Sequence, residues 1–118
     1  LLITKKLYTF VETNFSTVNI LFYEYFGTLF FAYGVITGLN GNFTSSSLME
    51  GTFSSVWIPL CFFMMICYGG RFTKAHLNPA VTLAWMLKKK DRVSFSNGML
   101  YWIAQFLGAI TGTGIGTR

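Results

Sequence analysis

The pair Asn78-Pro79 constrains the fold of this chain more than any other feature of its sequence. Asparagine is a preferred N-cap residue and proline a preferred first helical residue, so the pair predicts that a helix begins here. The apolar residues that follow continue to Lys88, which gives a helix of about ten residues, or roughly 15 Å. The hydrocarbon core of a membrane is about 30 Å thick. A helix over 79–88 therefore crosses only half of a bilayer.

The residues at the end of this helix set its direction. Lys88, Lys89, Lys90 and Arg92 place its carboxyl end at an aqueous face. Its amino end, with free N–H groups and the positive end of the helix dipole, then lies near the midplane. Irregular backbone at that depth is tolerated only where protein buries it or where it lines a wet cavity. Residues 70–77 are therefore predicted to re-enter the membrane and to form part of a permeation or binding path.

The composition also predicts a membrane protein. Hydrophobic residues make up 53% of the chain and charged residues only 11%, whereas a soluble domain carries about 25% charged residues. Three apolar stretches, over 18–39, 52–69 and 96–117, are each long enough to cross a bilayer. Residues 1–17 precede the first stretch, and residues 40–50 form a loop. The predicted fold is an all-α membrane protein with three transmembrane helices plus one re-entrant half-helix.

The basic residues predict the orientation. Lys5 and Lys6 precede the first stretch and the cluster at 88–92 follows the second, whereas the loop at 40–50 has no Lys or Arg. The positive-inside rule therefore puts the N-terminal segment and the basic link in the cytoplasm or its topological equivalent. A net charge of +5 can indicate nucleic-acid binding, but these residues flank membrane spans and so favour lipid headgroups. We expect membrane lipid as a partner and no nucleic acid.

Two polar residues fall inside the predicted spans, Glu24 in the first and Gln105 in the third. An ionisable group there costs at least about 2.5 kcal/mol unless it has a partner. One interpretation is that Glu24 accepts hydrogen bonds from backbone N–H groups of 70–77 and holds that segment in shape. The other is a proton or cation site. The first is favoured because no second carboxylate or histidine lies on a facing span to form a relay.

Residues that could carry a reaction are few. His76 adjoins the predicted helix start, where it is expected to pack and to form hydrogen bonds, and no nucleophile is paired with a base. Cys61 and Cys67 lie in an apolar run without a second metal-binding pair, so they are predicted to be buried packing residues. We expect no enzyme, no cofactor and no metal. Glycines at four-residue spacing predict close helix contacts within the bundle, at Gly34, Gly38, Gly108, Gly112 and Gly116.

Three blocks of the sequence, in this order, resemble the first repeat of the major intrinsic protein family, the aquaporins and aquaglyceroporins. They are Glu24-Tyr25-Phe26-Gly27-Thr28, the stretch Ala75 to Thr82 with its Asn-Pro-Ala motif, and the stretch Tyr101 to Ala109. Together they extend over nearly the whole chain. The resemblance implies a single aquaporin-like repeat over 18–118 and a passive channel in which two inverted repeats bring their half-helices together at the midplane.

The resemblance also implies roles for the residues at the helix start. Asn78 would donate its side-chain amide to the permeating solute. Pro79 and Ala80 would hold the two half-helices in contact, and Val81 would supply an apolar wall. Ile58 falls where the family places a residue of its outer constriction.

Further roles concern the segment before the helix. The carbonyl groups of Lys74, Ala75 and His76 would form part of a ladder of hydrogen-bond acceptors leading to the midplane. Glu24 and Gln105 would support the re-entrant segment. The family usually has Ser-Gly where this chain has Thr73-Lys74, so Lys74 is expected either to point into the aqueous vestibule or to displace a neighbour.

The largest departure is that these 118 residues contain one Asn-Pro-Ala motif and one half-helix. Two functions therefore stay open. The favoured one is a channel, or half-channel, for water or small neutral solutes such as glycerol. The alternative is a non-conducting structural subunit of a larger membrane assembly. Both imply an integral membrane protein, in a membrane that the sequence does not identify. Both also imply that the protein is oligomeric and that its partners are a second repeat or other membrane subunits.

Overall fold

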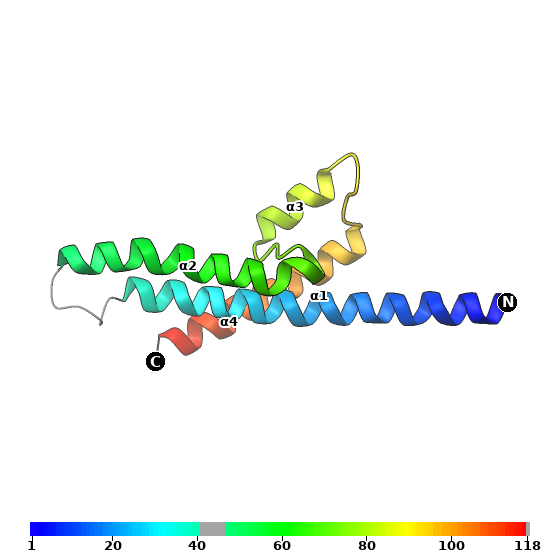
Figure 1. The fold of residues 1–118 in the computed structure, drawn as a ribbon, viewed down its shortest axis with the longest axis horizontal. Helices are drawn as coiled ribbons and strands as arrows, with labels where there is room; N and C mark the ends of the chain where they lie inside the picture. The colour runs from blue at the N-terminus through cyan, green and yellow to red at the C-terminus, as the bar shows by residue number, and fades with distance from the viewer. Residues whose placement is uncertain (41–46, 118) are drawn as a thin grey trace.

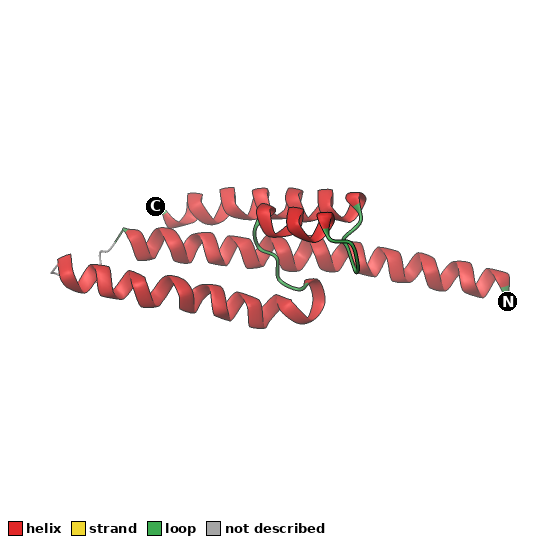
Figure 2. Cartoon of the chain, turned by 90° about the horizontal axis from the view of Figure 1, so that it is seen from above, coloured by secondary structure: helices red, strands yellow, loops and turns green. Residues whose placement is uncertain are grey.

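The computed structural model describes residues 1–40 and 47–117. It contains four helices, α1 (Leu2–Leu39), α2 (Ser47–Thr73), α3 (Pro79–Leu87) and α4 (Phe95–Gly116). Helix α1 lies between α2 and α4 and contacts both, whereas the short helix α3 leaves the bundle and contacts α4 (Figures 1 and 2). Residues 74–78, between the end of α2 and the beginning of α3, are not helical. Three long helices plus one short helix confirm the fold predicted from the sequence.

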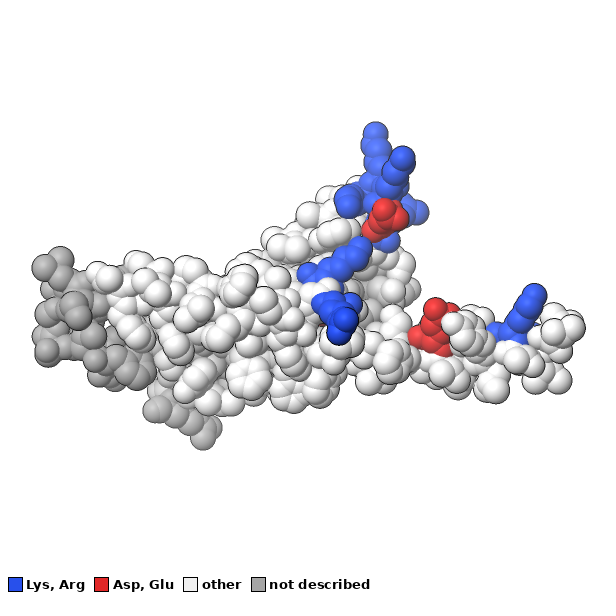
Figure 3. All heavy atoms as spheres, in the orientation of Figure 1, with Lys and Arg blue, Asp and Glu red and all other residues white. Residues whose placement is uncertain are grey.

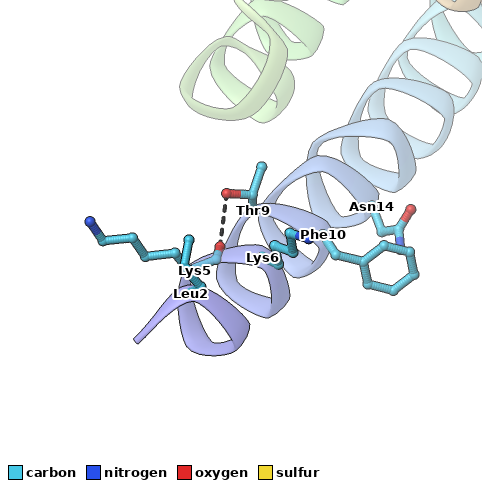
Figure 4. A pocket seen from close by; sticks show the side chains of 6 residues that line it. All are labelled: Leu2, Lys5, Lys6, Thr9, Phe10 and Asn14. Atoms are coloured by element: carbon cyan, nitrogen blue, oxygen red, sulfur yellow. Dashed lines mark hydrogen bonds between the residues drawn. The ribbon is translucent and has the colours of Figure 1, made fainter.

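Helix α1 begins earlier than the first predicted span, because residues 1–17 continue the same helix. The sequence has no glycine or proline before Gly27 that would stop it. At 38 residues, α1 is about 57 Å long, well above a hydrocarbon core of about 30 Å. Its first part extends beyond the bundle (Figure 1). Figure 4 shows side chains of this part, in which the Thr9 hydroxyl donates a hydrogen bond to the carbonyl of Lys5 at 3.0 Å. The whole of α1 is therefore longer than a single crossing of the hydrocarbon core requires.

Helix α2 also exceeds its predicted bounds of 52–69. It begins at Ser47, so the last residues of the expected loop at 40–50 are helical, and residues 41–46 of that loop lie outside the described residues. It ends at Thr73, which shortens the irregular re-entrant segment to 74–78.

Two helices of the described chain are long and apolar enough to cross a membrane, Leu2–Leu39 and Thr52–Thr73. Helix α4 has 22 residues, or about 33 Å, and its sequence includes Ser, Asn, Gln, Thr and Gly among the apolar residues. Three of its glycines, Gly108, Gly112 and Gly116, pack against α1. The third long helix of the bundle therefore has a row of glycines where it contacts α1.

Glycines allow the close contacts of α1 with both neighbours. A Cβ atom on Gly108 or Gly112 would meet the backbone of α1, at the carbonyl oxygens of Tyr25 and Leu29 respectively. Helix α4 thus packs directly on the backbone of α1, as the four-residue spacing of its glycines predicted.

On the other side of α1, Gly34 and Gly38 face side chains of α2. A Cβ on Gly34 would lie 2.7 Å from the sulfur of Cys61, and one on Gly38 would lie 3.1 Å from Ile58 Cγ1. Cys61 is buried in this contact, but the prediction of burial is wrong for Cys67, which is exposed. Cys67 lies on another face of α2, which α1 does not cover.

Candidate functional site

The re-entrant segment has an unusual backbone. Lys74, Ala75 and Leu77 have φ angles of 64°, 47° and 53°, in the left-handed region. For residues with a Cβ atom this region costs roughly 1–2 kcal/mol per residue in a helical conformation. Such a conformation persists only where the surrounding structure fixes it. Something in the bundle must therefore hold this segment in place.

Glu24 of α1 provides that support. Its side chain is 0% exposed. One carboxylate oxygen, Oε1, accepts hydrogen bonds from the Thr73 hydroxyl at 2.7 Å and the His76 N–H at 3.1 Å. The other, Oε2, accepts from the Leu77 N–H at 2.8 Å and from Gln105 Nε2 at 3.0 Å. The contact expected between Glu24 and the re-entrant N–H groups is therefore present, and four donors offset the cost of burying the carboxylate.

Gln105 links this carboxylate to helix α3. Its Nε2 also donates to Thr82 Oγ1 at 2.9 Å, and the same hydroxyl lies 3.1 Å from His76 Nδ1. The His76 ring is buried and stacks on Tyr101, with ring centroids 4.4 Å apart, while the Tyr101 hydroxyl donates to the carbonyl of Thr73 at 2.8 Å. The buried polar network thus joins α1, the end of α2, the re-entrant segment, α3 and α4.

The network also determines where the carbonyl groups of the re-entrant segment point. The N–H of Ala75 donates to Thr73 Oγ1 at 3.3 Å, and the next two N–H groups donate to Glu24. No peptide bond in the described part of the chain is cis, so each carbonyl points away from the N–H of its own peptide unit. The carbonyls of Ala75 and His76 therefore point away from Glu24, and the carbonyl of Lys74 points away from the Thr73 hydroxyl.

Asn78 caps helix α3, as Asn78-Pro79 predicted. Its backbone is extended (φ −155°, ψ 127°), and its Oδ1 accepts a hydrogen bond from the Ala80 N–H at 2.8 Å. This bond fixes the amide with its oxygen toward the helix, so the two N–H donors of Nδ2 remain for another acceptor. Asn78, Ala80 and Val81 are all exposed. Pro79 is half-buried, and its carbonyl accepts a hydrogen bond from Trp102 Nε1 at 3.0 Å.

A groove of about 330 Å³ lies beside this helix start, between α1 and α4. Thr28, Asn78, Pro79 and Gln105 are among its lining residues. Two buried oxygens, Thr28 Oγ1 and Gln105 Oε1, have no hydrogen-bond partner within the described chain. Buried polar atoms are nearly always paired. The groove therefore offers polar groups that another part of an assembly, or water, can satisfy.

Ile58 is not part of this cluster. It lies on α2, half-buried against Gly38 of α1, fifteen residues or about 22 Å of helix before α2 ends at Thr73. The structure therefore separates Ile58 from the other seven residues expected to line a path.

Lys74 is exposed. Its Nζ lies 4.2 Å from the ring centroid of Trp85, and Lys88 Nζ lies 4.0 Å from the same centroid. Both are cation–π contacts. Lys and Arg side chains gather around the end of α3 and the link that follows it (Figure 3). Lys74 thus belongs to the basic, aqueous end of the site.

The backbone at Lys74 leads to a first prediction. Lys74→Gly and Lys74→Ala both remove the contact with Trp85, but only glycine adopts a φ of 64° without strain. We expect the glycine variant to be more stable than the alanine variant by about 1 kcal/mol. Denaturant titration of the purified protein in detergent measures the difference. At the exposed helical position Ala84, glycine should instead be less stable than alanine by about 1 kcal/mol; the same order at both positions would contradict the left-handed backbone.

Comparison with known proteins identifies the family. The family model described as "Major intrinsic protein" matches residues 9–117. Aquaporin PIP2-7 of Musa acuminata is 34% identical over 106 residues, which cover 85% of this chain and 36% of that protein. The lens fiber major intrinsic protein of Lithobates pipiens is 32% identical over 106 residues, covering 86% of this chain and 37% of that protein. Aquaporin-4 of Mus musculus is 43% identical over 65 residues, 51% of this chain and 19% of that protein.

No solved structure matches the chain. The family match extends over nearly all of the described helices, and the site contains the Asn-Pro-Ala helix start within it. This is an all-α protein with two helices long and apolar enough to cross a membrane, and the chain belongs to the major intrinsic protein family. It spans 36% of the length of the first of the curated relatives it matches.

Proposed function

We propose that this chain is one repeat of a passive channel for water or small neutral solutes such as glycerol, rather than an enzyme. The observation that carries the proposal is the fixed amide of Asn78. Its oxygen is held by the helix it caps, at 2.8 Å from the Ala80 N–H, and its N–H donors face outward at the start of a half-helix. A donor held in this way can bind the oxygen of a passing molecule without reorganisation.

The outward carbonyls complement this donor. Lys74, Ala75 and His76 supply acceptors one after another, so a water or hydroxyl group can exchange hydrogen bonds along them before it reaches Asn78. The amino end of α3 carries the positive end of the helix dipole, which disfavours cations at that point. Val81 adds an exposed apolar surface beside the donor. Neutral molecules with both donors and acceptors suit this arrangement best.

A second repeat is the proposed partner. The groove beside Pro79 has buried oxygens without partners at Thr28 and Gln105, which an opposing half-helix or its water can satisfy. Pro79 and Ala80, half-buried and exposed in this chain, would then form the contact between the half-helices. The comparisons give no support to the alternative of a non-conducting structural subunit, because the relatives named above are aquaporins and a major intrinsic protein.

Replacement of Asn78 by aspartate tests the proposal. Aspartate caps a helix as well as asparagine does, so the fold should be retained. It has no N–H donors, however, and places a carboxylate where the solute must pass. We expect water permeability to fall at least tenfold, the equivalent of about 1.4 kcal/mol in the barrier. Osmotic swelling of proteoliposomes that contain the native assembly measures it.

The matched control is Asn97→Asp, the same chemical change in the first turn of α4. It should leave swelling unchanged. If folded Asn78→Asp protein conducts water like the wild type, the channel function proposed for this site is wrong.

A further inference from the structure

A second groove lies between the last turns of α3, the basic link and the beginning of α4. It has a volume of about 580 Å³, in the range of small-molecule sites, and shares no residue with the groove beside Asn78. Most of its lining is apolar, from Leu83, Met86, Leu87, Val93, Phe95 and Trp102. Two polar residues, Arg92 and Ser94, complete it. The groove thus has an apolar wall with a cationic and hydroxyl-bearing end.

The position of this groove matches the membrane interface. Its polar residues belong to the link at 88–94, which joins two helices that both reach the basic side of the protein. From the link, α3 and α4 both run toward the membrane interior, so the apolar wall continues below the polar end. A lipid has the same order of groups, with a phosphate at the interface and acyl chains beneath it.

The charge of the link complements an anionic headgroup. It contains four cationic residues and one acidic residue, Asp91, so its net charge is four minus one, or +3. Arg92 is exposed, and a guanidinium binds phosphate oxygens through two parallel N–H donors. Clusters of Lys and Arg beside membrane spans attract anionic lipids.

The apolar wall is open to lipid. Leu87 is 75% exposed and Phe95 is 70% exposed. The indole N–H of Trp102 is already bonded to the carbonyl of Pro79, so this residue presents its apolar ring rather than a free donor to the groove. An acyl chain along these side chains would cover apolar surface without leaving a polar group unpaired.

We propose that this groove binds one anionic phospholipid, with the phosphate on Arg92 and Ser94 and an acyl chain along Leu87 and Trp102. The proposal goes beyond the channel function and does not depend on it. It differs from general attraction of the bilayer surface because it requires one particular cation. A polar molecule or a protein segment would not match a groove that has a cationic group at one end and an apolar wall along the rest of its length.

The tryptophans of the chain allow a direct test. The chain has three, and a variant with Trp57→Phe and Trp85→Phe retains only Trp102 in the groove. In proteoliposomes of the native assembly, phosphatidylserine with brominated acyl chains should quench Trp102 fluorescence several-fold more effectively than brominated phosphatidylcholine. A variant that retains only Trp57, on α2, should show no such preference.

Two substitutions in the link separate a specific site from surface charge. Arg92→Gln and Lys89→Gln each remove one positive charge from exposed positions. The preference for phosphatidylserine at Trp102 should disappear in Arg92→Gln and remain in Lys89→Gln. Equal loss in both variants, or equal quenching by the two lipids, would overturn the proposal in favour of general surface attraction. Absence of quenching by either lipid would show that protein covers the groove and would overturn it as well.

Discussion

Glu24→Gln is expected to destabilise the folded protein by about 3 kcal/mol. The carboxylate accepts two hydrogen bonds at each oxygen, from the Thr73 hydroxyl, two backbone N–H groups and Gln105. Glutamine has nearly the same shape but only one acceptor oxygen, and its NH2 group would face two donors. Each buried donor left unpaired costs roughly 1–3 kcal/mol.

The effect should be greatest in the re-entrant segment, because the N–H groups of His76 and Leu77 both donate to this carboxylate. Two measurements check this, a denaturant titration in detergent and the rate of tryptic cleavage after Lys74, which should rise as the segment loosens. Glu12→Gln is the matched control, since Glu12 is exposed on the N-terminal part of α1. Equal stability of the two variants would show that Glu24 does not hold the segment.

Several parts of the site could be predicted from the sequence, because each follows either from a local helix-capping preference or from the large free-energy cost of burying an unpaired charge. Asn78-Pro79 is a strong helix start, and the structure begins α3 there. Glu24 was expected to accept hydrogen bonds because an unpaired carboxylate in a membrane is costly. The irregular backbone of the re-entrant segment offered the nearest free N–H groups.

Other contacts of the same network could not be predicted. The hydroxyl of Thr82 donates a hydrogen bond at 3.3 Å to the carbonyl of Asn78, four residues earlier. A threonine at this position therefore needs no hydrogen-bond partner from another helix. Its further contact with Gln105 depends on how α3 and α4 are oriented, which no local pattern specifies. Tyr101 is similar, because a tyrosine in an apolar helix carries no burial penalty large enough to demand a particular partner. The groove between α3 and α4 likewise follows from relative orientation alone.

The close packing of α4 glycines on α1 leads to a second prediction of a large loss of stability. Gly112→Ala is expected to destabilise the protein by about 3 kcal/mol, at the upper end of the usual cost of overpacking. The added methyl group would clash with the carbonyl of Leu29. Backbone atoms cannot rotate away as a side chain can, so α1 and α4 would have to separate. That separation would also break the hydrogen bond from the Tyr25 hydroxyl to Thr111 Oγ1, now 3.1 Å.

The same helix contains a control of opposite sign. A Cβ on Gly114 would meet nothing within 4 Å. Alanine is favoured over glycine inside a helix by about 1 kcal/mol, so Gly114→Ala should be neutral or stabilising while Gly112→Ala is strongly destabilising. Thermal unfolding of both variants in detergent distinguishes these outcomes. Two variants of equal stability would mean that α4 does not pack on the backbone of α1 at Leu29, and the polar network that joins Gln105 to Glu24 would then lose the helix contact that positions it.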